Sequence, residues 1–235
     1  VVQNISFDVK PGEVFAIMGA SGAGKSVLLR GIIGLLKPTE GRVLIAGKDA
    51  SRKVTHQEIR TSLIFQAGAL FNSMTVFDNL AFYPREHHLY SEDEIRDKVM
   101  HTLEILSLKH AAEKLPAELS GGMRKRVSIA RGLMMEPQLL LYDEPTSELD
   151  PIMAATISEI IACLRNDTGV TSVVVTHDRE LAKSISDRIA LLHEGKLLAV
   201  SDPSALMNNP DPIVQEFLSP EININEPRFK TTSSS

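Results

Sequence analysis

The sequence predicts an α/β fold with a mainly parallel sheet, a small antiparallel β subdomain and an inserted helical subdomain. Uninterrupted apolar runs at 139–142 and 172–175 are typical of strands that are buried on both faces. Segments with helical periodicity alternate with these runs, which favours parallel strands covered by helices. Between about residues 67 and 137 only helical patterns occur, so we expect the helical subdomain there.

Composition limits the class of protein. With 235 residues, 43% of them hydrophobic, the chain can bury one large core with a smaller lobe. The net charge of −5 gives no basic field for wrapping DNA or RNA, so we expect no nucleic-acid partner. No run of about 18 apolar residues predicts a membrane span, and no signal peptide pattern is present. The single cysteine, Cys163, excludes an intrachain disulfide, and its helical pattern predicts a small packing residue.

The N-terminal part predicts two strands and a phosphate-binding loop. Apolar residues alternate with polar ones at 5–9 and are continuous at 14–18, on either side of a turn at 10–13, which indicates a pair of strands. The second strand leads into the pattern G-x-x-x-x-G-K-[ST], and an apolar helix follows it. Glycines there let the backbone approach phosphates closely. We therefore expect a nucleoside triphosphate to bind the segment Gly19, Ala20, Ser21, Gly22, Ala23, Gly24, Lys25 and Ser26, with Lys25 on the β- and γ-phosphates and Ser26 on Mg²⁺.

The later helices and strands are predicted from residues that break or cap helices. A break at 37–41 precedes a strand at 42–46, and a short buried strand at 63–65 leads to Gln66. A capping box at 91–94 opens one helix of the lobe, and a second begins near 120–122. Further elements are a strand at 139–142, a helix through 157–164, a strand at 172–175, a hairpin of 189–192 with 196–200, and a short helix after Asp202.

Two carboxylates follow the apolar strand at 139–142. In a parallel sheet, ligands bind beyond the carboxyl ends of the strands, which is where Asp143 and Glu144 stand. Asp143 can hold Mg²⁺ directly or through water, and Glu144 can orient or deprotonate an attacking water. Phosphoryl transfer needs charge neutralisation and positioning, and these residue types supply both.

The segment Leu119-Ser120-Gly121-Gly122-Met123 precedes this strand, and with it the whole set resembles the ABC transporter ATPase family over about positions 1–205. A serine at a helix N-terminus can stabilise phosphate charge. The resemblance implies that Ser120, Gly121 and Gly122 complete the ATP bound by a second copy in a head-to-tail dimer. It also implies that Gln66 joins Mg²⁺ and water to the helical lobe, that Asp150 crosses the dimer interface and that His177 contacts the γ-phosphate. ATP and Mg²⁺ are the ligands implied.

Several segments narrow the resemblance. Met123, together with residues 65–71, 75–82 and 85–87, resembles the ATPase subunits of MCE-type (Mla-like) lipid transporters. That resemblance implies a peripheral subunit at the cytoplasmic face of the inner membrane, with a membrane permease and an MCE-domain lipid-binding protein as partners. It divides the chain into an ABC ATPase domain at 1–207 and a C-terminal extension at 208–235. We expect Val214, Phe217 and Leu218 of this extension to dock across the dimer.

Two alternatives remain at this stage. One is the ATPase subunit of another importer, for amino acids or metal chelates. The other is a non-transport ABC ATPase of the kind that acts in DNA repair or on chromosomes. The second would need a long coiled coil between the phosphate loop and the segment at 119–123, and the sequence shows no heptads there.

Overall fold

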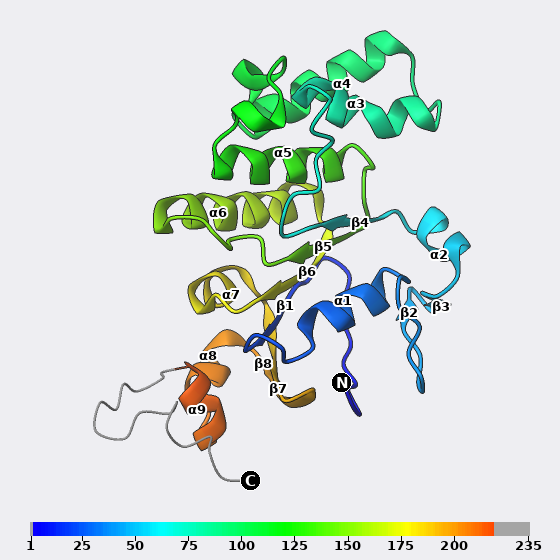
Figure 1. Cartoon of the computed structure of the whole chain (residues 1–235). Coiled ribbons are helices and arrows are strands. Elements are labelled where there is room, and N and C mark those ends of the chain that lie inside the picture. Colours follow the sequence, from blue (N-terminus) through cyan, green and yellow to red (C-terminus); the bar gives the residue numbers. More distant parts are fainter. Residues whose placement is uncertain (1, 219–235) are drawn as a thin grey trace.

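A six-stranded sheet runs through the middle of the structure, with helices on both faces (Figure 1). The structure is a computed structural model that describes residues 2–218. The strand order is β4-β5-β6-β1-β7-β8, with every pair parallel except β7 and β8. This confirms the mainly parallel sheet. The strands are β1 (Val14–Gly19), β4 (Thr61–Ile64), β5 (Leu139–Asp143), β6 (Thr171–Thr176), β7 (Arg188–His193) and β8 (Lys196–Ser201), while β2 (Leu44–Ile45) and β3 (Lys48–Asp49) form a separate antiparallel pair.

The helices divide between the two faces of the sheet and the lobe beyond it. Helix α1 covers one face and α6 and α7 the other, while α3, α4 and α5 lie together at one end of the molecule (Figure 1). Within residues 2–218, no helix is long and apolar enough to cross a membrane. The helices are α1 (Lys25–Ile32), α2 (Lys53–Glu58), α3 (Val76–Glu86), α4 (Glu92–Ile105), α5 (Gly121–Leu133), α6 (Pro151–Thr168), α7 (Arg179–Ile185), α8 (Pro203–Met207) and α9 (Pro212–Leu218), with 3-10 turns at Lys109–Ala111 and Pro116–Glu118.

Alternation along the strands fills both faces of the sheet. Because successive strand side chains point to opposite sides, neighbours on β5 enter different cores. Tyr142 packs with residues of α6 and the helical lobe, whereas Leu141 packs with Leu29 of α1. All three side chains are buried. The central strands are therefore buried on both sides, as their uninterrupted apolar sequence predicts.

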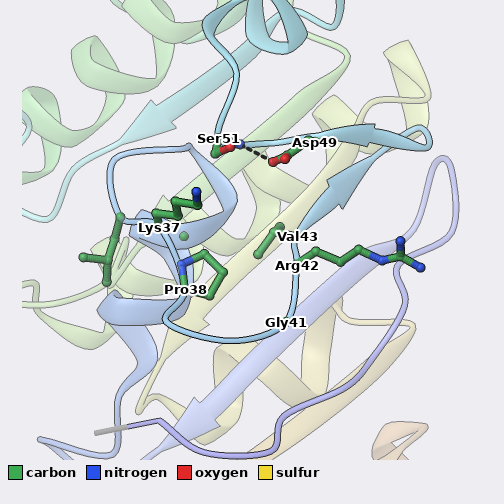
Figure 2. A pocket seen from close by; sticks show the side chains of 9 residues that line it. Lys37, Pro38, Gly41, Arg42, Val43, Asp49 and Ser51 are labelled. Atoms are coloured by element: carbon green, nitrogen blue, oxygen red, sulfur yellow. Dashed lines mark hydrogen bonds between the residues drawn. The ribbon is translucent and has the colours of Figure 1, made fainter.

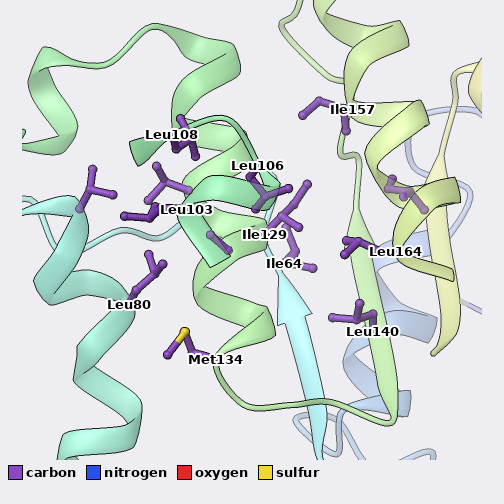
Figure 3. Close-up of a cluster of buried hydrophobic side chains, with 14 of the residues drawn as sticks. Ile64, Leu80, Leu103, Leu106, Leu108, Ile129, Met134, Leu140, Ile157 and Leu164 are labelled. Carbon is purple, nitrogen blue, oxygen red and sulfur yellow. The ribbon is translucent and has the colours of Figure 1, made fainter. Parts of the chain in front are cut away.

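The helical lobe shares the core of the sheet. The capping box predicted at 91–94 is present, since Ser91 and Glu94 exchange side-chain to backbone contacts at the start of α4. Figure 3 shows Leu103, Leu106 and Ile129 from the lobe beside Ile64 of β4. These side chains are buried, and they connect the lobe to the edge of the sheet that carries β4 and β5.

The predicted strand at 5–9 is wrong. Residues 5–9 have no regular strand pairing, and β1 begins only at Val14. Both edges of β1 are occupied, because it pairs with β6 on one side and β7 on the other. The N-terminal segment instead lies against the sheet face, where Phe7 stacks on Phe15 with ring centroids 5.1 Å apart. Its apolar residues alternate because one side of the segment covers the core.

The predicted docking of the C-terminal apolar patch across a dimer is also wrong. Val214 and Leu218 of α9 are buried within their own chain, and Phe217 is partly buried beside them. They pack with Met18, Leu191 and other residues of β1, β7, α7 and α8. The proposed division at residue 207 stays a prediction, and residues 219–235 of the extension lie outside the described residues.

Cys163 differs from its predicted role as a packing residue. It is exposed on α6, while the neighbouring Leu164 faces the core. The helical pattern at 157–164 located the buried face correctly at Ile157 and Ile161, but Cys163 lies outside that stripe.

Candidate functional site

The loop from Gly19 to Ser26 joins the central strand β1 to α1. Gly22 and Gly24 have φ angles of 81° and 100°, which L side chains rarely adopt. Gly19 has no room for a side chain, because a Cβ there would lie 2.5 Å from the carbonyl oxygen of Leu192 on β7. No side chain caps the start of α1. The Val27 N–H donates to the Gly24 carbonyl at 3.1 Å, while the N–H groups of Lys25 and Ser26 have no side-chain cap and can bind a ligand. The helix dipole favours a negative one.

Lys25 places a cation at the centre of this loop. Its Nζ donates hydrogen bonds to the carbonyl oxygens of Gly19 and Ala20, at 2.8 and 3.1 Å. The same atom lies 3.3 Å from Oε1 of Glu144, and the two side chains are only 8% and 12% exposed. The structure thus brings together the predicted phosphate-binding lysine and the predicted base in one shielded ion pair.

Ser26 and Asp143 meet at the carboxyl end of β5. The Ser26 hydroxyl donates a hydrogen bond to Oδ1 of Asp143 over 3.2 Å. Burial raises the pKa of Asp143, and the Ser26 hydrogen bond acts in the opposite direction. No cluster of three or more His, Cys, Asp or Glu side chains that could hold a metal occurs within residues 2–218. The donor set still fits Mg²⁺, which usually takes one or two carboxylates together with phosphate oxygens and water.

Glu144 follows Asp143 in a left-handed backbone conformation, with a φ of 47°. Its N–H donates to the Val175 carbonyl at 2.9 Å, so the strained residue is held by the neighbouring strand β6. Its Oε2 accepts a hydrogen bond from the His177 backbone N–H at 3.1 Å and lies 2.8 Å from His177 Nδ1. Because a carboxylate only accepts, Nδ1 carries the proton and Nε2 faces away from this contact.

Gln66 lies just beyond β4 and is exposed. Its carbonyl oxygen accepts a hydrogen bond from Lys125 Nζ, which also donates to the Glu144 carbonyl at 3.3 Å and to Ser147 Oγ at 3.4 Å. Sequence reasoning missed Lys125, because a lysine among basic residues on a helix is typical of a solvated surface. In the structure it is buried, and burial lowers its pKa.

The remaining predicted residues gather at two adjacent helix N-termini. Ser120 caps α5 by accepting from the Met123 N–H at 3.3 Å. Asp150 caps α6 by accepting from the N–H groups of Ile152 and Met153, both at 3.0 Å. A Cβ at Gly122 would lie 2.9 Å from the Met153 sulfur, so only glycine fits this contact without a shift.

The predicted residues therefore form two groups. Within residues 2–218, no hydrogen bond or ion pair joins Ser120, Gly121, Gly122 or Asp150 to Lys25, Ser26 or Glu144. One group surrounds the loop at 19–26, and the other presents the N-termini of α5 and α6.

Among residues 2–218, a small hollow lies away from both groups and a larger one lies beside His177. The smaller has a volume of about 30 Å³ and is lined by residues including Lys37, Arg42 and Asp49 (Figure 2). It is too small for a nucleotide and contains no predicted site residue. Its only dashed contact joins the Ser51 N–H to Asp49 at 2.8 Å, and this hydrogen bond lowers the pKa of Asp49 (Figure 2). The larger hollow, of about 760 Å³, is lined by His177, residues of 146–159 and residues of α7.

Comparison with known proteins identifies the family. The sequence model of the family described as ABC transporter matches residues 2–147. The chain belongs to the ABC transporter family. It carries the family's ATP-binding domain and shares the fold of ABC ATPases.

Several curated relatives of this ABC ATPase are known. It is 42% identical over 223 residues to the intermembrane phospholipid transport system ATP-binding protein MlaF of Escherichia coli, covering 93% of this chain and 82% of MlaF. It is 41% identical over 221 residues to a probable ribonucleotide transport ATP-binding protein, mkl, of Mycobacterium leprae, covering 92% of this chain. The chain spans 63% of the length of that relative and 61% of its Mycobacterium bovis counterpart.

Solved structures of ABC ATPases share its fold. CbiO1 of Clostridium perfringens, described as part of the transporter complex cbiONQ, superimposes with a TM-score of 0.81 at 32% identity, covering 93% of this chain and 88% of CbiO1. The ATP-binding cassette MJ0796, described as a dimer bound to ADP and Pi, gives a TM-score of 0.78 at 32% identity over 86% of this chain and 90% of that one.

Proposed function

We propose that this ABC ATPase hydrolyses ATP to drive the transport of phospholipid or another lipid between membranes. It acts as a peripheral subunit at the cytoplasmic face of the inner membrane, with a membrane permease and an MCE-domain lipid-binding protein. The observation that carries the proposal is the relationship to MlaF, because this chain covers 82% of MlaF at 42% identity. The mkl relatives extend further beyond the match, which covers 61% to 63% of their length.

The group around the loop binds the nucleotide. The backbone N–H groups of residues 19–26 and the start of α1 surround the phosphates, and Lys25 neutralises their charge. Ser26, Asp143 and the side chain of Gln66 hold Mg²⁺, which when bound neutralises charge on the transferred phosphoryl group. The 3.2 Å contact between Ser26 and Asp143 supports this assignment, because it places two oxygen ligands side by side.

Glu144 acts on the attacking water, and His177 contacts the γ-phosphate. The Glu144 carboxylate accepts a proton from water, and the His177 backbone N–H at 3.1 Å fixes its direction. His177 Nδ1–H donates a hydrogen bond to the same carboxylate at 2.8 Å, which leaves Nε2 of the ring for the γ-phosphate. The two contacts from His177 thus restrain one oxygen of the carboxylate on which hydrolysis depends.

The second group acts on the nucleotide of a second copy. Ser120, Gly121 and Gly122 present the N-terminal end of α5, and Asp150 stands beside them at the start of α6. Since these residues make no hydrogen bond to the loop group within residues 2–218, a head-to-tail pair of chains is the arrangement that unites both groups. The dimeric form of the related cassette MJ0796 supports this arrangement.

Replacing Glu144 by glutamine tests the hydrolytic role. The amide cannot accept a proton, so we expect kcat to fall by roughly 100-fold or more while ATP still binds. ATP with Mg²⁺ should then hold E144Q as a dimer, which size-exclusion chromatography with light scattering measures. Glu159→Gln on the exposed part of α6 is the matched control, and it should behave like the parent. Parental turnover in E144Q would contradict the assignment of the base.

Purification from membranes tests the transport substrate. The chain should copurify with a permease, an MCE-domain protein and bound lipid, identified by mass spectrometry. The alternative is an importer subunit, which the methionine import protein MetN of Carboxydothermus hydrogenoformans supports at 40% identity over 94% of this chain. Copurification of a periplasmic solute-binding protein without lipid would overturn the lipid assignment and favour this alternative.

A further inference from the structure

Lys125 is a buried cation with a complete set of uncharged acceptors. It lies on the second turn of α5 and is 8% exposed. An ammonium group has three hydrogens, and Lys125 Nζ has three acceptors: the carbonyl oxygens of Gln66 and Glu144 and the hydroxyl of Ser147. Burying a charged amine in this way is costly unless its hydrogen bonds are made. A lysine at this position therefore needs all three groups in place.

The same face of α5 holds the rest of the Gln66 loop. Ser128 Oγ donates to the Gly68 carbonyl at 3.0 Å, and Arg131 Nη1 donates to the Ala69 carbonyl at 2.7 Å. The residues at 125, 128 and 131 are three apart, so they follow one another along one side of the helix. They bind the carbonyls of Gln66, Gly68 and Ala69, in the same order along the chain. The loop is thus attached to α5 along its length.

Lys125 differs from the other two donors in what else it contacts. The Glu144 carbonyl also accepts from the N–H and Oγ of Ser147, at 3.2 and 2.9 Å, so it keeps partners without Lys125. The Gln66 carbonyl takes its hydrogen bond from Lys125. Among the donors at 125, 128 and 131, Lys125 is therefore the one that bonds both to the Gln66 loop and to the turn that carries Glu144.

We infer that Lys125 is a positioning residue, which fixes the Gln66 loop against the Glu144 turn and attaches both to the helix that begins at Ser120. The inference rests on the proposed hydrolysis of ATP for its functional consequence. The contacts of Lys125 Nζ are to acceptors of the protein itself, so it acts by setting the distance between Gln66 and Glu144. A displacement of about 1 Å in such a group can lower a rate by roughly 100-fold. The role therefore predicts an effect on turnover rather than on nucleotide affinity.

Steady-state kinetics separates the two effects. In Lys125→Met the stem is kept and all three donors are lost. We expect kcat to fall about 10-fold or more, while the Kd for ATP stays within about 3-fold because Lys25 and its loop are untouched. Lys125→Arg, which keeps charge and donors, should restore most of kcat. The matched control is Arg126→Met, which removes a neighbouring cation of α5 that donates to the Leu106 carbonyl in the lobe.

Hydrogen exchange gives a readout without turnover. In protein without nucleotide, amide exchange of peptides covering residues 63–72 should rise in K125M and stay at the parental level in R126M. Should K125M fail to fold, Lys125→Gln replaces it, since the shorter side chain reaches fewer acceptors and the expected direction is the same. Unchanged exchange of these peptides in K125M would show that Lys125 does not hold the Gln66 loop in place. Raised exchange with a parental kcat would show that holding the loop does not position groups for hydrolysis. A parent without ATPase activity but with the expected exchange pattern would overturn the proposed function alone.

Discussion

Replacing Val214 by alanine tests whether α9 belongs to the core of its own chain. Val214 is 1% exposed and packs against residues of β1, β7 and α8. The substitution removes two buried carbon groups, worth about 0.8 kcal/mol each, and leaves a cavity that adds to the cost. The expected loss in the free energy of unfolding is about 2 kcal/mol. For a chain of this size that corresponds to a fall in Tm of about 4 to 8 °C.

Thermal unfolding followed by circular dichroism measures this shift. Ile213→Ala is the matched control, because Ile213 is the preceding residue of the same helix and is 43% exposed. It should change Tm by less than about 2 °C. Burial within one chain also requires that the V214A shift be the same at low and high protein concentration. Equal shifts in the two variants, or a V214A shift that grows with dilution, would refute the intrachain packing.

Two further predictions concern the helical lobe. Asn79→Ala should lower the free energy of unfolding by about 2 kcal/mol in urea denaturation, because the buried amide oxygen accepts from the Phe71 N–H, which would be left unpaired. The Phe71 carbonyl loses its bond from the Asn79 amide but keeps the one from the Met74 N–H. A loss below about 1 kcal/mol would contradict this prediction. The pKa of Asp78 is lowered chiefly by the hydrogen bond from the Thr75 hydroxyl and then by Arg85. The ionised carboxylate therefore stabilises the fold at pH values above its unfolded pKa of about 4. This stabilisation is lost as the pH falls below that value. Unfolding free energies measured between about pH 5 and 2 should therefore fall more steeply for the parent than for Asp78→Asn, and equal slopes would exclude the effect.

Local signals explain which parts of the fold could be predicted. The phosphate loop, the carboxylates after β5 and the caps of α4 and α5 are each encoded within about ten residues. The positions of the central strands could be predicted as well, because strands buried on both faces need a continuous apolar sequence. Contacts such as Ser26 with Asp143 then follow from topology, since β1 and β5 end at the same edge of the sheet.

The errors arise where the partner of a segment decides its structure. Residues 5–9 have the alternation of a strand, but the edges of β1 are already taken by β6 and β7. The apolar face of α9 was visible in the sequence, whereas the surface that it covers was not. Lys125 had no local signal at all, because its acceptors come from two segments that are distant along the chain, the Gln66 loop and the turn at 144–147.

The contact between Lys25 and Glu144 affects which anions the loop selects. The ammonium charge is balanced by a carboxylate 3.3 Å away and by two carbonyl oxygens. An incoming anion must compete with that internal counter-ion, so a singly charged species such as chloride gains little by exchange. A triphosphate carries several charges and can also bind the loop N–H groups, so we expect it to displace the carboxylate. Replacement of the Glu144 carboxylate by a ligand at Lys25 thus favours highly charged ligands. The same replacement frees Glu144 from the lysine.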